Sequence, residues 1–192
     1  MARNTLVVRP VTAETLGDFV RLFQARGAPH YCWCTPHRFR DVGTLENGEK
    51  ESRMCALVKS GTPVGVLAYE GDESVGWCSV APRETYVKLE RSRTMPRVRD
   101  VPTWTVLCLF VPRARRGTGI SQSLLAGAVQ YARKEGATEI EGYPYDTAGI
   151  SSTHRGHSSA FAKAGFRQDG ESIRWVIADL SRPSSSKAKR ER

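Results

Sequence analysis

One stretch in the second half of the chain combines an apolar run, a basic turn and an amphipathic segment. Residues 106–111 are apolar, the turn that follows reads Pro-Arg-Ala-Arg-Arg-Gly-Thr-Gly, and apolar positions then recur at helical spacing up to Gly136. A helix start leaves unpaired amides and a partly positive dipole end, which favour anions. Gly117 and Gly119 allow close backbone approach. This strand–turn–helix junction therefore predicts a site for a pyrophosphate, with two arginines adding positive charge.

Two motifs in this region resemble the GCN5-related N-acetyltransferase (GNAT) superfamily. Residues 116–121, Arg-Gly-Thr-Gly-Ile-Ser, match the acetyl-CoA loop pattern of Arg or Gln, two residues, Gly, one residue, then Gly or Ala, except that Ser121 stands at the last position. Residues 161–166, Phe-Ala-Lys-Ala-Gly-Phe, resemble the family's "aromatic, three residues, Gly-Phe" signature. The resemblance spans 104–175. It implies the GNAT fold, with a mixed, mostly antiparallel sheet flanked by helices, and acetyl-CoA as cosubstrate.

The order of the expected elements agrees with an α/β domain. Apolar patterning predicts a first strand, two helices, a three-strand meander, the helix up to Gly136, and then alternating strands and a short helix. Residues 82–101 form a long, strongly basic connection, which is either functional or merely solvated. The expected ranges are 5–11, 16–23, 49–60, 64–69, 75–80, 104–111, 120–134, 138–145, 158–164, 166–168 and 173–178.

Length, charge and cysteine content limit the classes of protein to consider. With 192 residues, we expect one domain over 1–180 and a basic, Ser- and Lys-rich tail over 181–192, a composition typical of disorder. The net charge of +9 suits a polyphosphate ligand, nucleic acid or an acidic surface. No apolar leader or bilayer-length run is visible, and the five cysteines are an odd number. We therefore expect a cytoplasmic protein without a membrane partner.

The resemblance also implies which residues hold the cosubstrate. In the family, the backbone of the strand before the loop binds the pantetheine arm and polarises the thioester carbonyl, and the loop holds the pyrophosphate. Carried over to this sequence, the cofactor-binding residues are Leu109, Phe110, Val111, Arg116, Gly117, Thr118, Gly119, Ile120 and Ser121, together with Ser159.

Residues 30–37, His-Tyr-Cys-Trp-Cys-Thr-Pro-His, have the most unusual composition in the chain. Their Cys-x-Cys spacing does not match the Cys-x₂₋₄-Cys pairs of structural zinc, so we predict no metal there. A packed aromatic and thiol loop is the simplest interpretation. In the family this region helps to wall the acceptor pocket, which would make Tyr31, Trp33 and His37 face the substrate, together with Trp77.

The acid and the base are not identified by the motifs. Many family members place a proton-donating Tyr where this chain has Phe161, and the apolar strand carries no carboxylate. The candidate acids are Ser158, Ser159, Tyr143 and Tyr145, with water as an alternative because a thiol has a pKa near 8.5. The candidate bases are His154, His37 and Glu84 acting through a water. Cys78 and Cys108 lie in apolar strands, where we expect buried thiols and no covalent acetyl-cysteine.

The sequence thus predicts an N-acetyltransferase that acts on a primary amine, in a small molecule or in a protein or peptide, by direct attack in a ternary complex. Three alternatives remain. One is a CoA-binding protein without catalysis, and another is a basic nucleic-acid-binding domain, which the motifs disfavour. The third interprets Gly117-x-Gly119 as a dinucleotide loop with Glu139 or Glu141 on the ribose, although the third glycine is missing. A homodimer also remains open.

Overall fold

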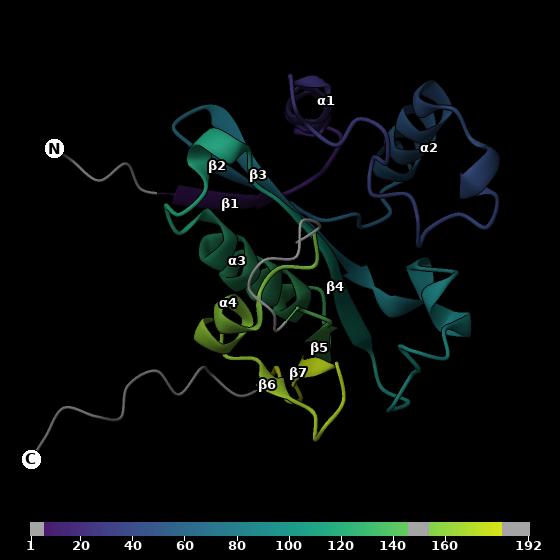
Figure 1. Cartoon of the computed structure of the whole chain (residues 1–192), viewed down its shortest axis with the longest axis vertical. Helices are drawn as coiled ribbons and strands as arrows, with labels where there is room; N and C mark the ends of the chain where they lie inside the picture. Colours follow the sequence, from purple (N-terminus) through teal and green to yellow (C-terminus); the bar gives the residue numbers. More distant parts are fainter. Residues whose placement is uncertain (1–5, 146–153, 182–192) are drawn as a thin grey trace, which may run out of the picture.

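The computed structural model describes residues 6–145 and 154–181, in which a seven-stranded sheet carries helices on both faces (Figure 1). The strands are β1 (Leu6–Pro10), β2 (Val66–Glu70), β3 (Glu73–Pro82), β4 (Thr103–Phe110), β5 (Glu139–Gly142), β6 (Arg167–Gln168) and β7 (Trp175–Ile177). Their order across the sheet is β1-β2-β3-β4-β5-β7-β6, and only β4 and β5 pair in parallel. The mixed, mostly antiparallel sheet predicted from the sequence is confirmed.

The helices form two layers. The helices α1 (Leu16–Gln24) and α2 (Asn47–Lys59) lie on one side of the sheet, and α3 (Ile120–Lys134) and α4 (Ser158–Lys163) lie on the other (Figure 1). Short 3-10 turns occupy Val42–Thr44, Arg83–Thr85, Leu89–Arg91 and Arg113–Arg115. The long basic connection after β3 therefore contains two of these turns and is less irregular than its composition suggests.

The ends of the helices depend on their capping residues. Gly119 (φ +87°) precedes α3 and Gly136 (φ +82°) follows its last turn, both in the left-handed region that glycine tolerates, so this helix has the predicted bounds. The helix α2 begins two residues earlier than predicted, because Glu46 and Glu49 form a capping box in which the Glu46 amide donates to Glu49 Oε2 at 2.8 Å. The strand expected over 138–145 is shorter, since β5 ends at Gly142.

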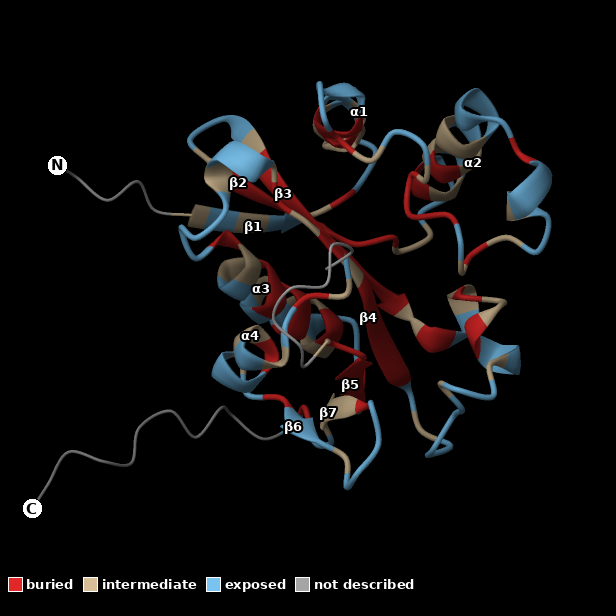
Figure 2. Ribbon diagram, viewed as in Figure 1, coloured by how far each residue is buried: buried red, intermediate tan, exposed pale blue. Residues whose placement is uncertain are grey.

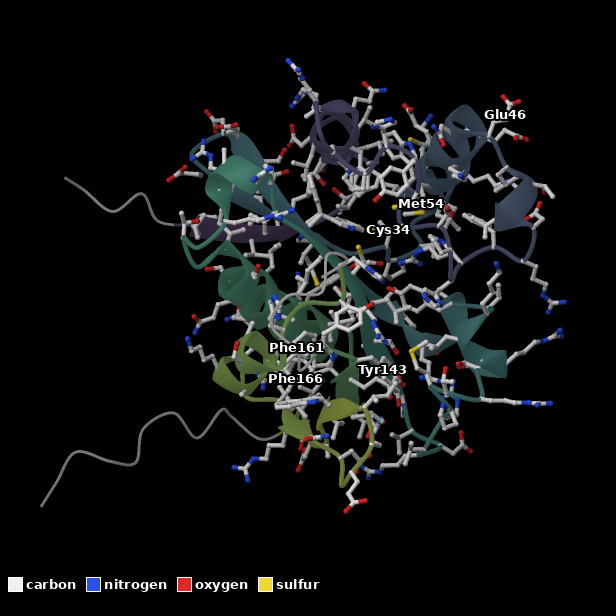
Figure 3. The ribbon with its side chains drawn as sticks, in the orientation of Figure 1. Cys34, Glu46, Met54, Tyr143, Phe161 and Phe166 are labelled. Atoms are coloured by element: carbon white, nitrogen blue, oxygen red, sulfur yellow. The ribbon has the colours of Figure 1, made fainter. Side chains whose placement is uncertain are left out.

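Two apolar cores lie on opposite faces of the sheet (Figure 2). The first packs the apolar side of α3, with Leu124, Leu125 and Ala128 fully buried, against the strands and against Phe161 and Phe166, whose rings are 4.9 Å apart. The second gathers aromatic rings beneath α1 and α2, together with Cys34 and Met54, which Figure 3 labels in that layer. The rings are Phe19, Phe23, Trp33, Tyr69 and Trp77.

The sheet opens between β4 and β5. Their parallel ladder joins residues 103–106 to residues 139–142, and β4 continues four residues further while β5 ends. On its other edge β4 carries a bulge, since Ser79 pairs with Cys108 and Val80 with Val106, which leaves Leu107 without a partner on β3. The end of β4 thus extends beyond β5 and has no strand partner on that side, which is where a ligand can approach it.

Candidate active site

A cleft of about 890 Å³ lies beside the open end of β4. Its walls come from five segments that are far apart in the sequence. They are the loop after α1 (residues 27–37), β3 with Tyr86, the end of β4 (residues 107–111), the turn into α3 (residues 115–122) and residues 154–163. The sheet opening described above therefore leads directly to the glycine-bearing turn.

The turn into α3 presents glycine backbone and the Arg116 side chain to the cleft. Gly117 (φ +79°) and Gly119 have no atom within 4 Å of where a Cβ would stand, so the space beside them is open. Arg115 is ion-paired with Glu70 and with Glu73, the latter at 2.9 Å. Within the described residues Arg116 makes no ion pair, and its Nε donates to the Val111 carbonyl at 3.2 Å.

Most of the residues predicted to hold the cosubstrate line this cleft. Thr118 is the exception, since its hydroxyl is turned back to donate to the Arg115 carbonyl at 2.7 Å. The predicted residues that do line the cleft are Leu109, Phe110, Val111, Arg116, Gly117, Gly119, Ile120, Ser121 and Ser159.

The amide of Leu109 is the backbone donor at the open edge of β4. It donates to the carbonyl of His154 at 2.5 Å. Gly156 (φ +80°) holds this segment against the strand, because a Cβ there would lie 2.6 Å from Leu109 Cδ1. The His154 carbonyl thus fills the place where the carbonyl of a ligand could accept a hydrogen bond from the Leu109 amide.

Two predicted histidines line the cleft in different settings. His37 is half-buried, and burial lowers its pKa below the usual 6.5, assisted by the positive charges of Lys88 and Arg155 and by the neighbouring His154. His154 is exposed at its outer side, and partial desolvation of its ring and the charge of Arg155 lower its pKa as well. Both imidazoles are therefore mainly neutral at pH 7, and His37 is the more enclosed.

Four other predicted acid or base residues, Glu84, Ser158, Tyr143 and Tyr145, lie outside the cleft lining. Glu84 is exposed and faces a separate small hollow of about 240 Å³ beside Trp104. Ser158 opens α4, and its amide donates to the Tyr145 carbonyl at 3.1 Å. Tyr143, labelled in Figure 3, is 1% exposed and bonds through its hydroxyl to Arg83 and Glu141 at 3.0 Å each. The tyrosine belongs to a buried ion-pair network, and burial raises its pKa.

The two tryptophans expected to face the acceptor belong to the core instead. Trp33 is 1% exposed and stacks on Phe23 at 5.1 Å, and Trp77 is fully buried with its Nε1 donating to Cys34 Sγ at 3.1 Å. Tyr31 does line the cleft and is 64% exposed. The tryptophans are buried because the loop after α1 turns inward through Trp33 and Cys34, both with φ near +50°.

Several cleft residues were not singled out by the sequence. They include Ser79, Tyr86, Leu107, Gln122, Gly156, His157, Ala160 and Lys163. No local pattern marks them, because their strands and loops meet only in the tertiary structure. Cys108, expected to be buried, is half-buried and also lines the cleft, whereas Cys78 is fully buried and burial raises its pKa.

The described residues contradict the dinucleotide interpretation. Glu139 and Glu141 are 1% exposed and ion-paired with arginines, so neither can reach a ribose. Across 6–145 and 154–181, no three His, Cys, Asp or Glu side chains gather so as to hold a metal ion. In the same residues, no helix has both the length and the apolar character that crossing a membrane requires.

Known proteins share this architecture. AAC(6′)-Ib, in complex with paromomycin and acetyl-CoA, superposes with a TM-score of 0.60 at 12% identity, over 96% of this chain and 99% of that chain. A polyamine N-acetyltransferase of Drosophila melanogaster gives 0.52 at 13% identity, over 91% and 100%. An N-acetyltransferase of Staphylococcus aureus Mu50 gives 0.51 at 14% identity, over 92% and 99%.

At these identities the structural likeness establishes the fold. No curated protein matches this chain in sequence. The sequence model of the acetyltransferase (GNAT) family, however, matches residues 20–148, which is more than half of the chain and includes the turn into α3. The family suggested by the two motifs is thereby confirmed, and the chain belongs to the GNAT family of acyl-CoA-dependent N-acetyltransferases.

Proposed function

We propose that this protein transfers the acetyl group of acetyl-CoA to the primary amine of a small molecule, by direct attack in a ternary complex. The observation that carries the proposal is the continuity of one cleft from the turn into α3, along the open end of β4, to His37 and Tyr31. Acetyl-CoA would place its pyrophosphate at Gly117 and Gly119 and its thioester near Leu109. The acceptor would enter from the side of the loop after α1.

The backbone of β4 would stabilise the oxyanion of the tetrahedral intermediate. The Leu109 amide points to the open edge, where the thioester carbonyl would replace the carbonyl of His154 as its acceptor. The neutral imidazole of His37 would take the proton from the attacking amine. Because a thiol has a pKa of about 8.5, the leaving thiolate needs only a weak acid such as water or the cleft residue Ser159.

The distribution of charge favours this proposal over nucleic-acid binding. Three arginines of the long basic connection, Arg83, Arg97 and Arg99, are ion-paired with glutamates, so much of its charge is already neutralised. A concave cleft of this size suits a cosubstrate and a small acceptor. A protein or peptide amine, a homodimer and a cytoplasmic setting stay predictions.

The first test measures the binding of acetyl-CoA to the parent and to the Arg116→Glu variant through the change in Tm on thermal unfolding. A ligand at a hundred times its Kd adds about 2.7 kcal/mol to the free energy of unfolding, which gives a clear rise in Tm. Reversing the charge of Arg116 should abolish the rise. Arg113→Glu is the matched control, because Arg113 is an exposed arginine three residues away that does not line the cleft.

An amine screen that measures released CoA then tests catalysis. Absence of a thermal shift at millimolar acetyl-CoA in the parent would contradict the proposal outright. Binding without release of CoA by any amine would support the alternative of a CoA-binding protein without catalysis.

A further inference from the structure

Arg38 is a buried cation for which the described part of the chain provides no carboxylate partner. Arg38 is 3% exposed, and two other arginines are equally buried, Arg174 at 3% and Arg83 at 0%. Arg83 is ion-paired with Glu90 and Glu141, and Arg174 with Glu139, Glu141 and Asp169. Within the described residues no carboxylate lies in ion-pair range of Arg38, and its Nε has no hydrogen-bond partner. Burying a charge without a counter-charge costs folding free energy, which indicates that Arg38 serves a role other than stability.

The guanidinium of Arg38 is held by neutral groups immediately behind the cleft. Its Nη2 donates to the Val64 carbonyl at 2.8 Å, to Tyr86 OH at 3.1 Å and to Ser79 Oγ at 3.4 Å. Its carbon lies 4.3 Å from the centre of the Tyr86 ring. Ser79 and Tyr86 themselves line the cleft, so two hydroxyls separate the charge from the ligand space.

Counting hydrogens shows what these hydroxyls offer to a ligand. The two hydrogens of Arg38 Nη2 serve three acceptors, so the hydroxyl oxygens of Ser79 and Tyr86 share one of them, and because these oxygens lie 3.1 Å apart one hydroxyl donates to the other. The second hydroxyl hydrogen has no acceptor among the described residues, and both residues belong to the cleft wall, where each is 1% exposed. The Arg38–Ser79–Tyr86 group therefore presents one hydrogen-bond donor backed by a positive charge, which is a site for an anionic oxygen.

The charges of the cleft point the same way. Its described lining contains no Asp or Glu, whereas it includes Arg116 and Lys163, and Lys88 acts on His37. A polycationic acceptor would meet no counter-charge there. A carboxylate would be attracted along the cleft and would compensate Arg38.

The position of Ser79 sets how far the anion lies from the reaction. Ser79 pairs with Cys108, the residue next to Leu109, whose amide is expected to bind the thioester carbonyl. Paired residues of neighbouring antiparallel strands are about 4.5–5.5 Å apart. The amine and the anion of the acceptor must therefore be close together, as they are in an α-amino acid. Tyr31, Pro36 and Leu107 provide apolar surface for its side chain.

Resting on the function proposed above, we propose that the acceptor is an α-amino acid with an apolar side chain, whose carboxylate binds at Ser79 and Tyr86 in front of Arg38. A single donor suits a carboxylate better than a phosphate dianion, which needs several. Arg38 acts here as a specificity-determining residue, since it supplies the charge without lining the cleft.

The test compares acceptors that differ only in the anionic group. The common L-amino acids and their primary amides are assayed with acetyl-CoA for CoA release, together with 2-aminoethyl phosphate and spermidine. For the preferred acceptor, kcat/KM should exceed that of its amide by roughly ten- to a hundredfold, mainly through KM. Free acids, unlike amides, should also raise Tm in the presence of CoA.

Three variants then test whether the preference for the acid over the amide depends on the Arg38–Ser79–Tyr86 group. Ser79→Ala, Tyr86→Phe and Arg38→Met should bring the acid-to-amide ratio close to one, while binding of acetyl-CoA, read from its thermal shift, persists and reports that each variant is folded. Tyr69→Phe is the matched control, because Tyr69 is a buried tyrosine outside the cleft whose hydroxyl donates to Asp18 at 2.8 Å. The control should keep the ratio of the parent.

Failure of this inference differs from failure of the proposed function. Without binding of acetyl-CoA, the function itself is wrong. If acetyl-CoA binds but amides or spermidine are preferred, or no carboxylate is acetylated or stabilising, the carboxylate site is overturned and the cleft still serves acetyl transfer. Preference for 2-aminoethyl phosphate would overturn the choice of carboxylate over phosphate, and an unchanged ratio in all three variants would overturn the location.

Discussion

His37 illustrates how a single side chain acquires its chemistry from its surroundings. Its imidazole is half-buried beside the cleft, and burial together with nearby positive charges lowers its pKa. Lowering the pKa favours the neutral form, which is the form that accepts a proton from an amine. The lowered pKa also affects stability, because His37 binds a proton more readily in the unfolded chain than in the folded protein. The stability that His37 contributes is therefore present above pH 6.5 and is lost as the pH falls below 6.5 towards the lowered pKa of the folded state.

Removing this imidazole should lower turnover more than binding. We expect His37→Gln to reduce kcat/KM by about 10²–10⁴-fold and to remove the acid limb that the parent shows below pH 6.5. The measurement is a pH–rate profile of CoA release. His30→Gln is the control, because His30 is an exposed histidine that does not line the cleft. An unchanged acid limb in the His37 variant would exclude His37 as the base.

At the scale of elements, the two ends of α3 allow ligand binding and stability to be tested separately. Gly119 and Gly136 stand at opposite ends of the same helix, both are in the left-handed region, and both have open space where a Cβ would go. A non-glycine residue there costs about 1–2 kcal/mol in backbone strain. Their substitution by alanine should therefore cost a similar amount of folding free energy.

Only one of these two glycines should matter for the ligand. We expect Gly119→Ala to weaken acetyl-CoA binding, since Gly119 lines the cleft beside the first amides of α3, and Gly136→Ala to leave the Kd unchanged. Isothermal titration with acetyl-CoA measures both. Equal affinities in the two variants would contradict a pyrophosphate site at this end of the helix.

At the scale of the whole molecule, a buried ion-pair network joins the connection after β3 to β5 and to Arg174, the residue before β7. Glu141 of β5 bonds to Arg83, to Arg174 Nε at 2.5 Å, and to the hydroxyls of Thr105 and Tyr143 at 3.0 Å each. The same network removes Tyr143 from the candidate acids, because its hydroxyl is committed to Arg83 and Glu141. The network joins the paired parts of β4 and β5, next to the point where these two strands separate.

Breaking this network should be far more costly than breaking a surface pair. We expect Glu141→Gln, which keeps the shape and removes the charge, to lower the free energy of unfolding by about 3–5 kcal/mol. Asp41→Asn removes an exposed pair with Arg53, whose atoms are 2.8 Å apart, and should cost less than about 1 kcal/mol. Urea unfolding measures both variants. Similar losses would show that the buried pairs contribute no more than the exposed one.

Features that depend on neighbours in the chain are specified by the amino-acid sequence without further information. The helix α3 and its terminal glycines, the hairpin at Gly71-Asp72, and the family are all encoded in contiguous segments, because capping, turn geometry and apolar periodicity act over a few residues. For the same reason, local sequence is enough to predict a pyrophosphate site at the turn beside Arg116.

Which side chains meet is settled only by tertiary contacts. Whether Trp33, Trp77 or Tyr143 faces a ligand depends on what packs over it, and whether Arg115 is free depends on carboxylates more than forty residues away. Composition did not distinguish Arg38 from the other arginines, since its significance lies in having no carboxylate partner within residues 6–145 and 154–181. Burial and charge compensation are properties of contacts between distant segments, and these exist only once the chain has folded.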